Sequence, residues 1–475
     1  MIAFRNRKRS SCIAMFCLLL MLSSLGVSWV HAATAAKQLS LAVAVSIAQK
    51  NDPWLIQNSH SQQAMEAMSV AAGTLPDPKV SVALANLPTD TFDFGQEAMT
   101  QLNVGVTQMI PRGDSLALRK KQLQQTAEQF PFQREERRAR LVVEVAKLWF
   151  DGYEAQESIR LIEEDRPLFV QLSEVAEASY SSALGKTRQQ DIIRAQLELT
   201  RLDDRLTVLQ QKREMAMEQL GNWVSDNFSN QYLTGSESRG EAASWGSLRL
   251  AEDLPVIRKL MNPGLLHFAQ KVEPQELYTS FITHPAVQDI ERKITASNTG
   301  VDLVRQKYRS EFGVNASYSY RDAAPNGADR ADLVSLGISF DLPWFTASRQ
   351  DKEVTAALAG AEAVKTMKWQ LLRKMIADFE KQRAQLNRLN QRSELYQETL
   401  LPQLHEQAEA SLTAYTNDDG DFAEVVRARI AELNGRLAAL KIDVERQKTV
   451  VQLNYFFMKS PDEIVAEELR KGEKQ

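Results

Sequence analysis

Three aspartates and a glutamate near the C-terminal end of the sequence are the residues best suited by type and spacing to a chemical role. The turn Asn417-Asp-Asp-Gly-Asp421 places three carboxylates around one glycine, and Glu424 follows it closely. Carboxylates held at short range repel one another and concentrate cations. We therefore predict a cation-attracting site, for which the candidates are Asp418, Asp419, Asp421 and Glu424. The alternative is a solvated turn in which Asp421 caps the following helix.

A second glycine-containing turn lies earlier in the chain and has a different composition. It contains Leu184-Gly185-Lys186, which combines an apolar side chain, a residue suited to a tight turn and a cation. A leucine exposed beside such a turn is an apolar anchor that a protein partner can bind. We predict a docking contact at Leu184, Gly185 and Lys186, and we assign Gly420 of the acidic turn to the same role. The alternative is a plain turn.

No group of residues in the sequence has the pattern of an enzyme site. His60, His267, His284 and His405 are scattered without the spacing of metal ligands. There is no phosphate-binding glycine loop and no nucleophile motif. The formal net charge of -4 indicates no basic surface for nucleic acid. We expect no catalysis, no cofactor, no metal site and no nucleic-acid partner.

The two turns occupy matching places in an internal repeat. Tyr180 matches Tyr415, Asp191-Ile-Ile-Arg-Ala195 matches Glu424-Val-Val-Arg-Ala428, and other pairs share a separation of 232 to 235 residues. A nearly constant separation indicates two copies of one structural unit. The prediction is a first repeat at 36–224, an insert at 225–275, a second repeat at 276–458 and a charged tail at 459–475.

Each repeat contains two segments in which apolar residues alternate with small or polar ones. They span about 79–87 and 100–110 in the first repeat, and about 311–321 and 332–342 in the second. This alternation is typical of strands, and the lengths are near those of tilted membrane strands. Four strands cannot close a barrel, whereas three chains would supply twelve. The alternative is a periplasmic sheet with one buried face.

A long helical hairpin follows each strand pair. The patterns cover 113–223, with its turn at about 181–188, and 345–457, with its turn at about 416–422. We expect Pro167 and Pro402 to kink or interrupt their helices. The outgoing helices carry heptads, which indicate coiled-coil packing. The heptad positions are Ala195, Leu199, Leu202, Leu206 and Leu209, and then Val426, Ile430, Leu433, Leu437, Leu440 and Val444.

The first 35 or so residues have the pattern of a cleaved secretory signal. Arg5, Arg7, Lys8 and Arg9 precede an apolar run, and small residues follow it. The two cysteines of the chain, Cys12 and Cys17, both lie in this segment and neither follows a lipobox. We expect an exported protein without disulfides or a lipid anchor. The alternative is an uncleaved membrane anchor.

Together these features resemble the TolC-type outer-membrane efflux proteins over the whole mature chain. The resemblance implies a mainly α-helical homotrimer with a shared twelve-stranded β-barrel in the outer membrane of a Gram-negative cell and a periplasmic α-helical coiled-coil tunnel. The implied partners are a periplasmic adaptor protein, an inner-membrane resistance-nodulation-division pump and outer-membrane lipid. Four short segments are most similar to the branch paired with heavy-metal pumps: Gly73-Thr-Leu-Pro-Asp-Pro-Lys79, Asn86-Leu-Pro88, Met99-Thr100 and Gln108-Met-Ile-Pro-Arg-Gly113.

The resemblance also implies roles for the two turns. Both would face the adaptor, and Glu424 corresponds to an acidic position at the periplasmic entrance, while Arg427 stands where a second acid is expected. The implied function is a passive exit duct of a tripartite efflux system, with heavy-metal cations as cargo. The alternatives are a duct for drug efflux or type I protein secretion, and a periplasmic coiled-coil scaffold without a pore.

Overall fold

The computed structural model describes residues 38–181, 188–224, 249–266, 268, 272–417 and 420–458. By its contacts the chain divides into two units, Met1–Gln38 and Leu39–Gln475. The predicted signal segment and the charged tail lie outside the described residues. The description below concerns the second unit.

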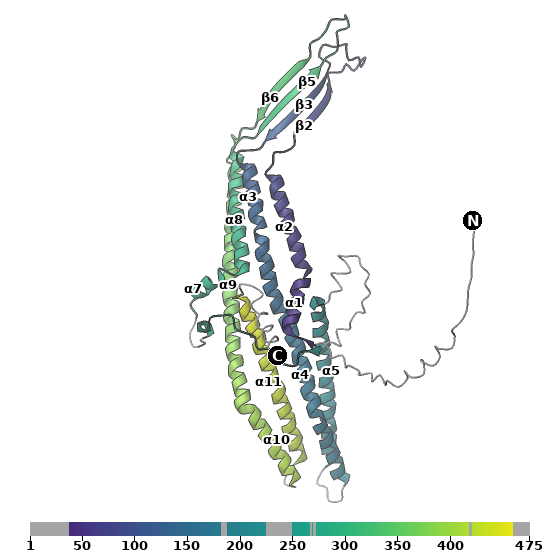
Figure 1. Cartoon of the computed structure of the whole chain (residues 1–475), viewed down its shortest axis with the longest axis vertical. Coiled ribbons are helices and arrows are strands. Elements are labelled where there is room, and N and C mark those ends of the chain that lie inside the picture. The colour runs from purple at the N-terminus through teal and green to yellow at the C-terminus, as the bar shows by residue number, and fades with distance from the viewer. Residues whose placement is uncertain are drawn as a thin grey trace, which may run out of the picture. The chain divides into compact units, whose positions relative to one another are not determined.

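Four strands of this unit form one antiparallel sheet in the order β2-β3-β5-β6 (Figure 1). Their bounds are Lys79–Ala85, Gln101–Ile110, Phe312–Tyr320 and Leu333–Phe340. The central pairing joins the two repeats, because β3 belongs to the first and β5 to the second, with Val104 opposite Tyr318. Strands β2 and β6 are the two edges, and no described strand pairs with their outer sides.

The two faces of this sheet differ sharply in chemistry. One face carries large apolar side chains, all of them exposed: Val80, Val82, Leu84, Leu102, Val104, Val106, Ile110, Phe312, Val314, Tyr318, Tyr320, Val334, Leu336, Ile338 and Phe340. The opposite face carries mainly small or polar residues, among them Ser81, Asn103, Gly105, Thr107, Asn315, Ser317, Ser335, Gly337 and Ser339. No described element covers the apolar face.

The helices of the two repeats follow the same order along the chain. The first repeat has α1 (Leu41–Asn51), α2 (Pro53–Ala72), α3 (Ser115–Ala127), α4 (Gln129–Ser181) and α5 (Gln189–Val224). The second repeat has α7 (Pro274–Phe281), α8 (Pro285–Arg305), α9 (Gln350–Leu395), α10 (Leu401–Thr416) and α11 (Phe422–Tyr455). The predicted tandem order of strand, strand and long helical hairpin is confirmed. Among the described helices, none combines the length and apolar character needed to cross a membrane.

The two matching prolines behave differently. Pro167 does not interrupt its helix, because α4 continues through it to Ser181. Ile162 and Phe169, on either side of it, are buried in one cluster, so packing holds the helix across the missing hydrogen bond. Pro402 instead follows a π turn, η4 (Tyr396–Leu400), which separates α9 from α10. An insertion of this kind bends a helix locally.

Six of the eleven heptad positions are buried, and the other five, Leu199, Leu206, Leu209, Ile430 and Leu440, are half-buried. Leu433 and Leu437 of α11 share one cluster with Leu202 of α5 and with residues of α4. Ala195, Val426 and Val444 are also buried. The heptads of the two repeats therefore pack into common cores, and this joins the first hairpin to the second.

Within the insert, buried amide side chains of α11 hold the stretch at 257–260. Gln447 Oε1 accepts from the backbone N–H of Ile257 at 2.9 Å. Asn454, which is fully buried, accepts from the N–H of Leu260 at 2.9 Å and donates to the carbonyl of Arg258 at 2.6 Å. These amides supply partners to three backbone groups of a stretch that lies outside any described helix or strand.

Matching residues of the two repeats also cap matching helices. Asp52 accepts from the N–H of Trp54 at the start of α2, and His284 Nδ1 accepts from the N–H of Ala286 at 3.2 Å at the start of α8. His284 Nε2 lies 3.0 Å from the carbonyl of Tyr455, to which it donates. The cap requires the neutral ring, because a protonated Nδ1 cannot accept, whereas Nε2–H can donate in either state. Burial, the largest influence, lowers the pKa of His284.

We predict that acidification weakens the fold at His284. Because its folded-state pKa lies below the ordinary value of about 6.5, its contribution is complete above that pH and declines as the pH falls toward the folded-state value. The His284→Asn variant keeps a neutral cap at every pH. Its unfolding midpoint in denaturant should therefore fall less between pH 7.5 and 5 than that of the parent protein. Identical pH profiles would contradict this role.

Candidate functional site at the second hairpin turn

The acidic turn joins α10, which ends at Thr416, to α11, which begins at Phe422. Gly420, Asp421 and Glu424 are among the described residues. Asp418 and Asp419 lie outside them, as do the docking candidates Leu184, Gly185 and Lys186. The geometry of the site therefore rests on the C-terminal half of the second turn.

Asp421 caps α11, as the alternative interpretation predicted. Its Oδ1 accepts from the backbone N–H of Ala423 at 3.2 Å, and its carbonyl accepts from the N–H of Glu424 at 3.0 Å. A carboxylate here also interacts favourably with the helix dipole. Asp421 is nevertheless exposed, so its negative charge still faces solvent.

Glu424 is paired with the arginine that replaces the expected second acid. Its Oε2 lies 3.0 Å from Arg427 Nη2, one helical turn along α11. The two side chains are 48% and 65% exposed, so the pair is a surface contact worth only a few tenths of a kcal/mol. Arg427 offsets the charge of Glu424 but does not hold the Glu424 side chain in one position. The electrostatic potential near the turn therefore depends on both residues.

Gly420 makes a close backbone approach that no other residue could make. A Cβ atom at this position would lie 2.6 Å from the backbone nitrogen of Tyr415 and 2.8 Å from the carbonyl carbon of Ala414. These are backbone atoms at the end of α10, so neither can rotate away. The turn can close tightly only with glycine at this position.

Phe422 anchors the turn to the rest of the molecule. Its ring packs edge-on against Tyr415 with centroids 5.7 Å apart. It is buried in a cluster with Val425 and Val426 of α11, Leu172 and Ala176 of α4, and Ala195 of α5. Our sequence analysis did not single out Phe422, although its spacing of three and four residues to Val425 and Val426 marks one helix face. The tight turn thus sits on a core shared by both hairpins.

Ion pairs connect the hairpins farther from the turn. Arg436 of α11 contacts Asp165 of α4 at 2.8 Å, and Lys448 of α11 contacts Asp151 of α4 at 2.5 Å. Burial lowers the pKa of Lys448, but its hydrogen bonds to Asp151 and Glu445 outweigh that effect and raise it overall. Lys448 therefore stays charged at neutral pH and holds α11 against α4.

The histidines do not come together. His60 contacts Gln63, His284 caps α8, and His405 pairs with Glu432 at 2.6 Å, while His267 lies outside the described residues. Within the described part of the chain, no group of three or more His, Cys, Asp or Glu side chains could hold a metal ion.

We predict that Gly420→Ala disrupts the turn while Gly360→Ala does not. The added methyl at Gly420 would overlap the backbone of α10, whereas nothing lies within 4 Å of a Cβ at Gly360 in α9. Alanine in an exposed helix interior stabilises by about 0.5–1 kcal/mol relative to glycine. Limited proteolysis near residue 420, followed by mass spectrometry, should show faster cleavage for Gly420→Ala only. Equal cleavage of both variants would refute the close approach.

Comparison with known proteins gives a match in structure and none in sequence. No protein-family model matches the chain, and no curated protein matches it. Among solved structures, CusC, whose structures are described in terms of folding and transmembrane channel formation, is 15% identical with a TM-score of 0.67, covering 88% of this chain and 91% of CusC. The CmeC outer membrane channel of Campylobacter jejuni is 12% identical with a TM-score of 0.68, covering 91% and 89%.

A third structure agrees with these two. The outer membrane protein VceC of Vibrio cholerae is 11% identical with a TM-score of 0.68, and the match covers 88% of this chain and 96% of VceC. At such low identity the likeness establishes the architecture alone, and it does so over nearly the full length of each structure. The chain therefore has the fold of the TolC-type outer-membrane channels, as the sequence resemblance predicted.

Proposed function

We propose that this chain is one subunit of an outer-membrane channel that acts as a passive exit duct of a tripartite efflux system. The observation that carries the proposal is the sheet β2-β3-β5-β6, with an uncovered apolar face, a largely small and polar opposite face and two unpaired edges. Lipid suits the first face and a water-filled lumen suits the second. The fold shared with CusC, CmeC and VceC supports this reading.

The open edges favour assembly as a homotrimer. An unpaired strand edge leaves backbone N–H and C=O groups without partners, which is very unfavourable in lipid. If β2 of one copy pairs with β6 of the next, three copies close a barrel of twelve strands. The same closure would place the helical hairpins around a common axis, as a tunnel in the periplasm. The predicted signal at 1–35 would deliver the chain across the inner membrane of a Gram-negative cell.

The hairpin turns would form the inner end of this tunnel. In a trimer, Asp421 and Glu424 each become three charges around one axis, joined by Asp418 and Asp419, and this ring would attract cations at the entrance. Because Arg427 offsets Glu424 in the described structure, the ring would be less acidic than Glu424 alone suggests.

Docking and cargo complete the proposal. Leu184, Gly185, Lys186 and Gly420 would contact a periplasmic adaptor, which in turn binds a resistance-nodulation-division pump. Photo-crosslinking from position 186 to a co-expressed adaptor tests that contact, and absence of any product would refute it.

Heavy-metal cations are the proposed cargo, because the segments at 73–79 and 108–113 resemble the branch paired with heavy-metal pumps. Unaltered metal tolerance of a deletion strain would exclude them.

A pair of adjacent substitutions on β6 tests the membrane assignment. Leu336 lies on the apolar face and is 81% exposed, while its neighbour Ser335 lies on the polar face. Arginine facing lipid near the membrane centre costs about 2–4 kcal/mol, whereas arginine facing a lumen costs little. Leu336→Arg should therefore abolish the heat-resistant trimer in outer-membrane extracts, and Ser335→Arg should preserve it. A soluble monomer for the parent protein would support the scaffold alternative instead.

Opposite substitutions at the Glu424–Arg427 pair test the entrance. In planar bilayers, Glu424→Gln should lower the preference of the pore for cations over anions, and Arg427→Gln should raise it, because each removes one member of an ion pair at 3.0 Å. The shift should shrink at high salt, where exposed charges are screened. Reversal potentials in a salt gradient measure the effect, and unchanged values for both variants would remove the gate role.

A further inference from the structure

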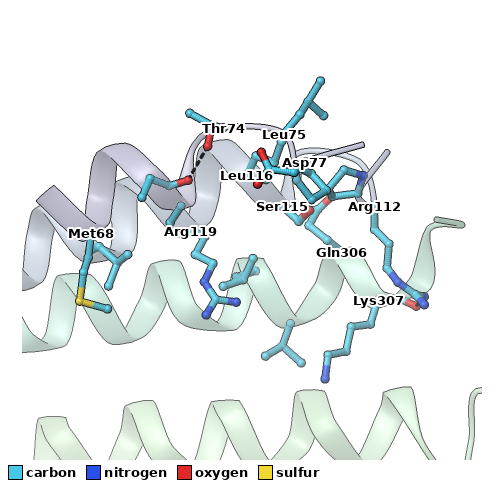
Figure 2. Close-up of a pocket in the computed structure, with 17 residues that line it drawn as sticks. Met68, Thr74, Leu75, Asp77, Arg112, Ser115, Leu116, Arg119, Gln306 and Lys307 are labelled. Carbon is cyan, nitrogen blue, oxygen red and sulfur yellow. Dashed lines mark hydrogen bonds between the residues drawn. The ribbon is translucent and has the colours of Figure 1, made fainter. Parts of the chain in front are cut away.

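A hollow separate from the hairpin turn lies where helices meet the sheet. It is a cavity of about 850 Å³ formed by the end of α2, the start of α3 and the end of α8 (Figure 2). Its walls include Asp77, two residues before β2, and Pro111, the residue directly after β3. Lys307 in the 3-10 turn η3 (Gln306–Tyr308), shortly before β5, closes it on the α8 side.

The lining combines three cations with an apolar wall. The cations are Arg112, Arg119 and Lys307, and Asp77 is the single acid. Met68, Leu75 and Leu116 are among the apolar members. In Figure 2, Arg112 and Lys307 lie near each other at one end of the hollow, whereas Arg119 lies apart from Arg112. The hollow therefore suits a ligand that is both anionic and partly apolar, and its net positive charge disfavours a metal cation.

Two of the three cations already have partners. Arg112 contacts Asp341 at 2.5 Å, and Lys307 contacts Glu353 at 2.9 Å. The exposed side chain of Arg119 has no ion pair or hydrogen bond with any other described residue, and it lies on the same face of α3 as Leu116 and Leu123. An anionic ligand would pair with this guanidinium, and an apolar part of the same ligand would contact the neighbouring leucines.

The position of the cavity identifies the source of such a ligand. The strands that begin and end at its rim carry the apolar face that the proposed function assigns to lipid. Under that assignment the rim lies at the boundary between membrane and periplasm, where phospholipid headgroups are found. Trp344 and Phe345, just after β6, are 75% and 88% exposed, as aromatic residues are at such a boundary.

We propose that this cavity binds the headgroup of an anionic phospholipid in the periplasmic leaflet of the outer membrane. The phosphate pairs with Arg119, Arg112 and Lys307 add positive charge elsewhere in the lining, and the glycerol and first acyl carbons lie against Leu75 and Leu116. This inference rests on the proposed membrane orientation of the sheet. It assigns a ligand to a site separate from the conducting path and from the hairpin turns.

Calorimetric titration of the detergent-solubilised protein with dihexanoyl phosphatidylglycerol tests the site. Arg119→Gln should weaken binding about tenfold, because it removes a charge-assisted contact. Arg119→Lys should retain most of the affinity. Lys121→Gln is the matched control, since it removes the same charge from α3 two residues away, on a different side of the helix and outside the cavity lining.

The headgroup specificity and the pore are measured separately. Dihexanoyl phosphatidylcholine and inorganic phosphate should each bind much more weakly than the anionic lipid. Equal binding of phosphatidylcholine, equal binding of free phosphate, or unchanged affinity in Arg119→Gln would each overturn the lipid site. Conductance of the same preparations in phosphatidylcholine bilayers should be equal for the parent and Arg119→Gln. If the lipid site fails while conductance persists, the proposed duct stands; if no conductance is seen for the parent protein, the duct itself fails.

Discussion

The sheet β2-β3-β5-β6 sets the constraint on which the rest of the structure depends. Its apolar face is uncovered by any described element, and β2 and β6 have no described partner on their outer sides. A sheet with both features is unstable as an isolated body in water, because apolar area and backbone polar groups are both left unsatisfied. In the proposed channel, lipid on one face and further copies of the chain at the edges would remove both costs together. The fold shared with known outer-membrane channels is consistent with that solution.

The helical part depends on a different principle, which is the joining of two similar hairpins through shared cores. Leu202 of the first repeat and Leu433 of the second lie in one cluster, and Phe422 joins the turn to Leu172. The buried Lys448 and its partner Asp151 add a charged contact between α11 and α4. Lys448 is buried but Asp151 is 43% exposed, so solvent partly screens this contact. The duplicated halves therefore act as one packed unit, although each would be a free hairpin alone.

Duplication also permitted the halves to diverge. Asp52 and His284 cap equivalent helices with different chemistry, so only the second repeat carries a cap that fails on protonation. At the equivalent prolines, α4 is continuous and the second hairpin has a π turn. The second repeat also carries the acidic turn. The second repeat thus differs from the first in the cap of α8, in the π turn and in the composition of its hairpin turn.

The sequence by itself determined the elements and their order. Strand alternation and heptads are local signals that chain geometry imposes, and the constant spacing between matching segments shows that the order of elements occurs twice. It also determined that Asp421 could cap a helix and that Leu336 and Ser335 face opposite sides of one strand. Only the tertiary structure decided which faces remain uncovered, that Arg427 offsets Glu424, that Gly420 touches the backbone of α10, and that Arg119 stands unpaired in a cavity among the described residues. These depend on distances between residues on different turns or different elements. A spacing along the chain fixes which side of an element a residue occupies, whereas its partner is fixed by how the elements pack.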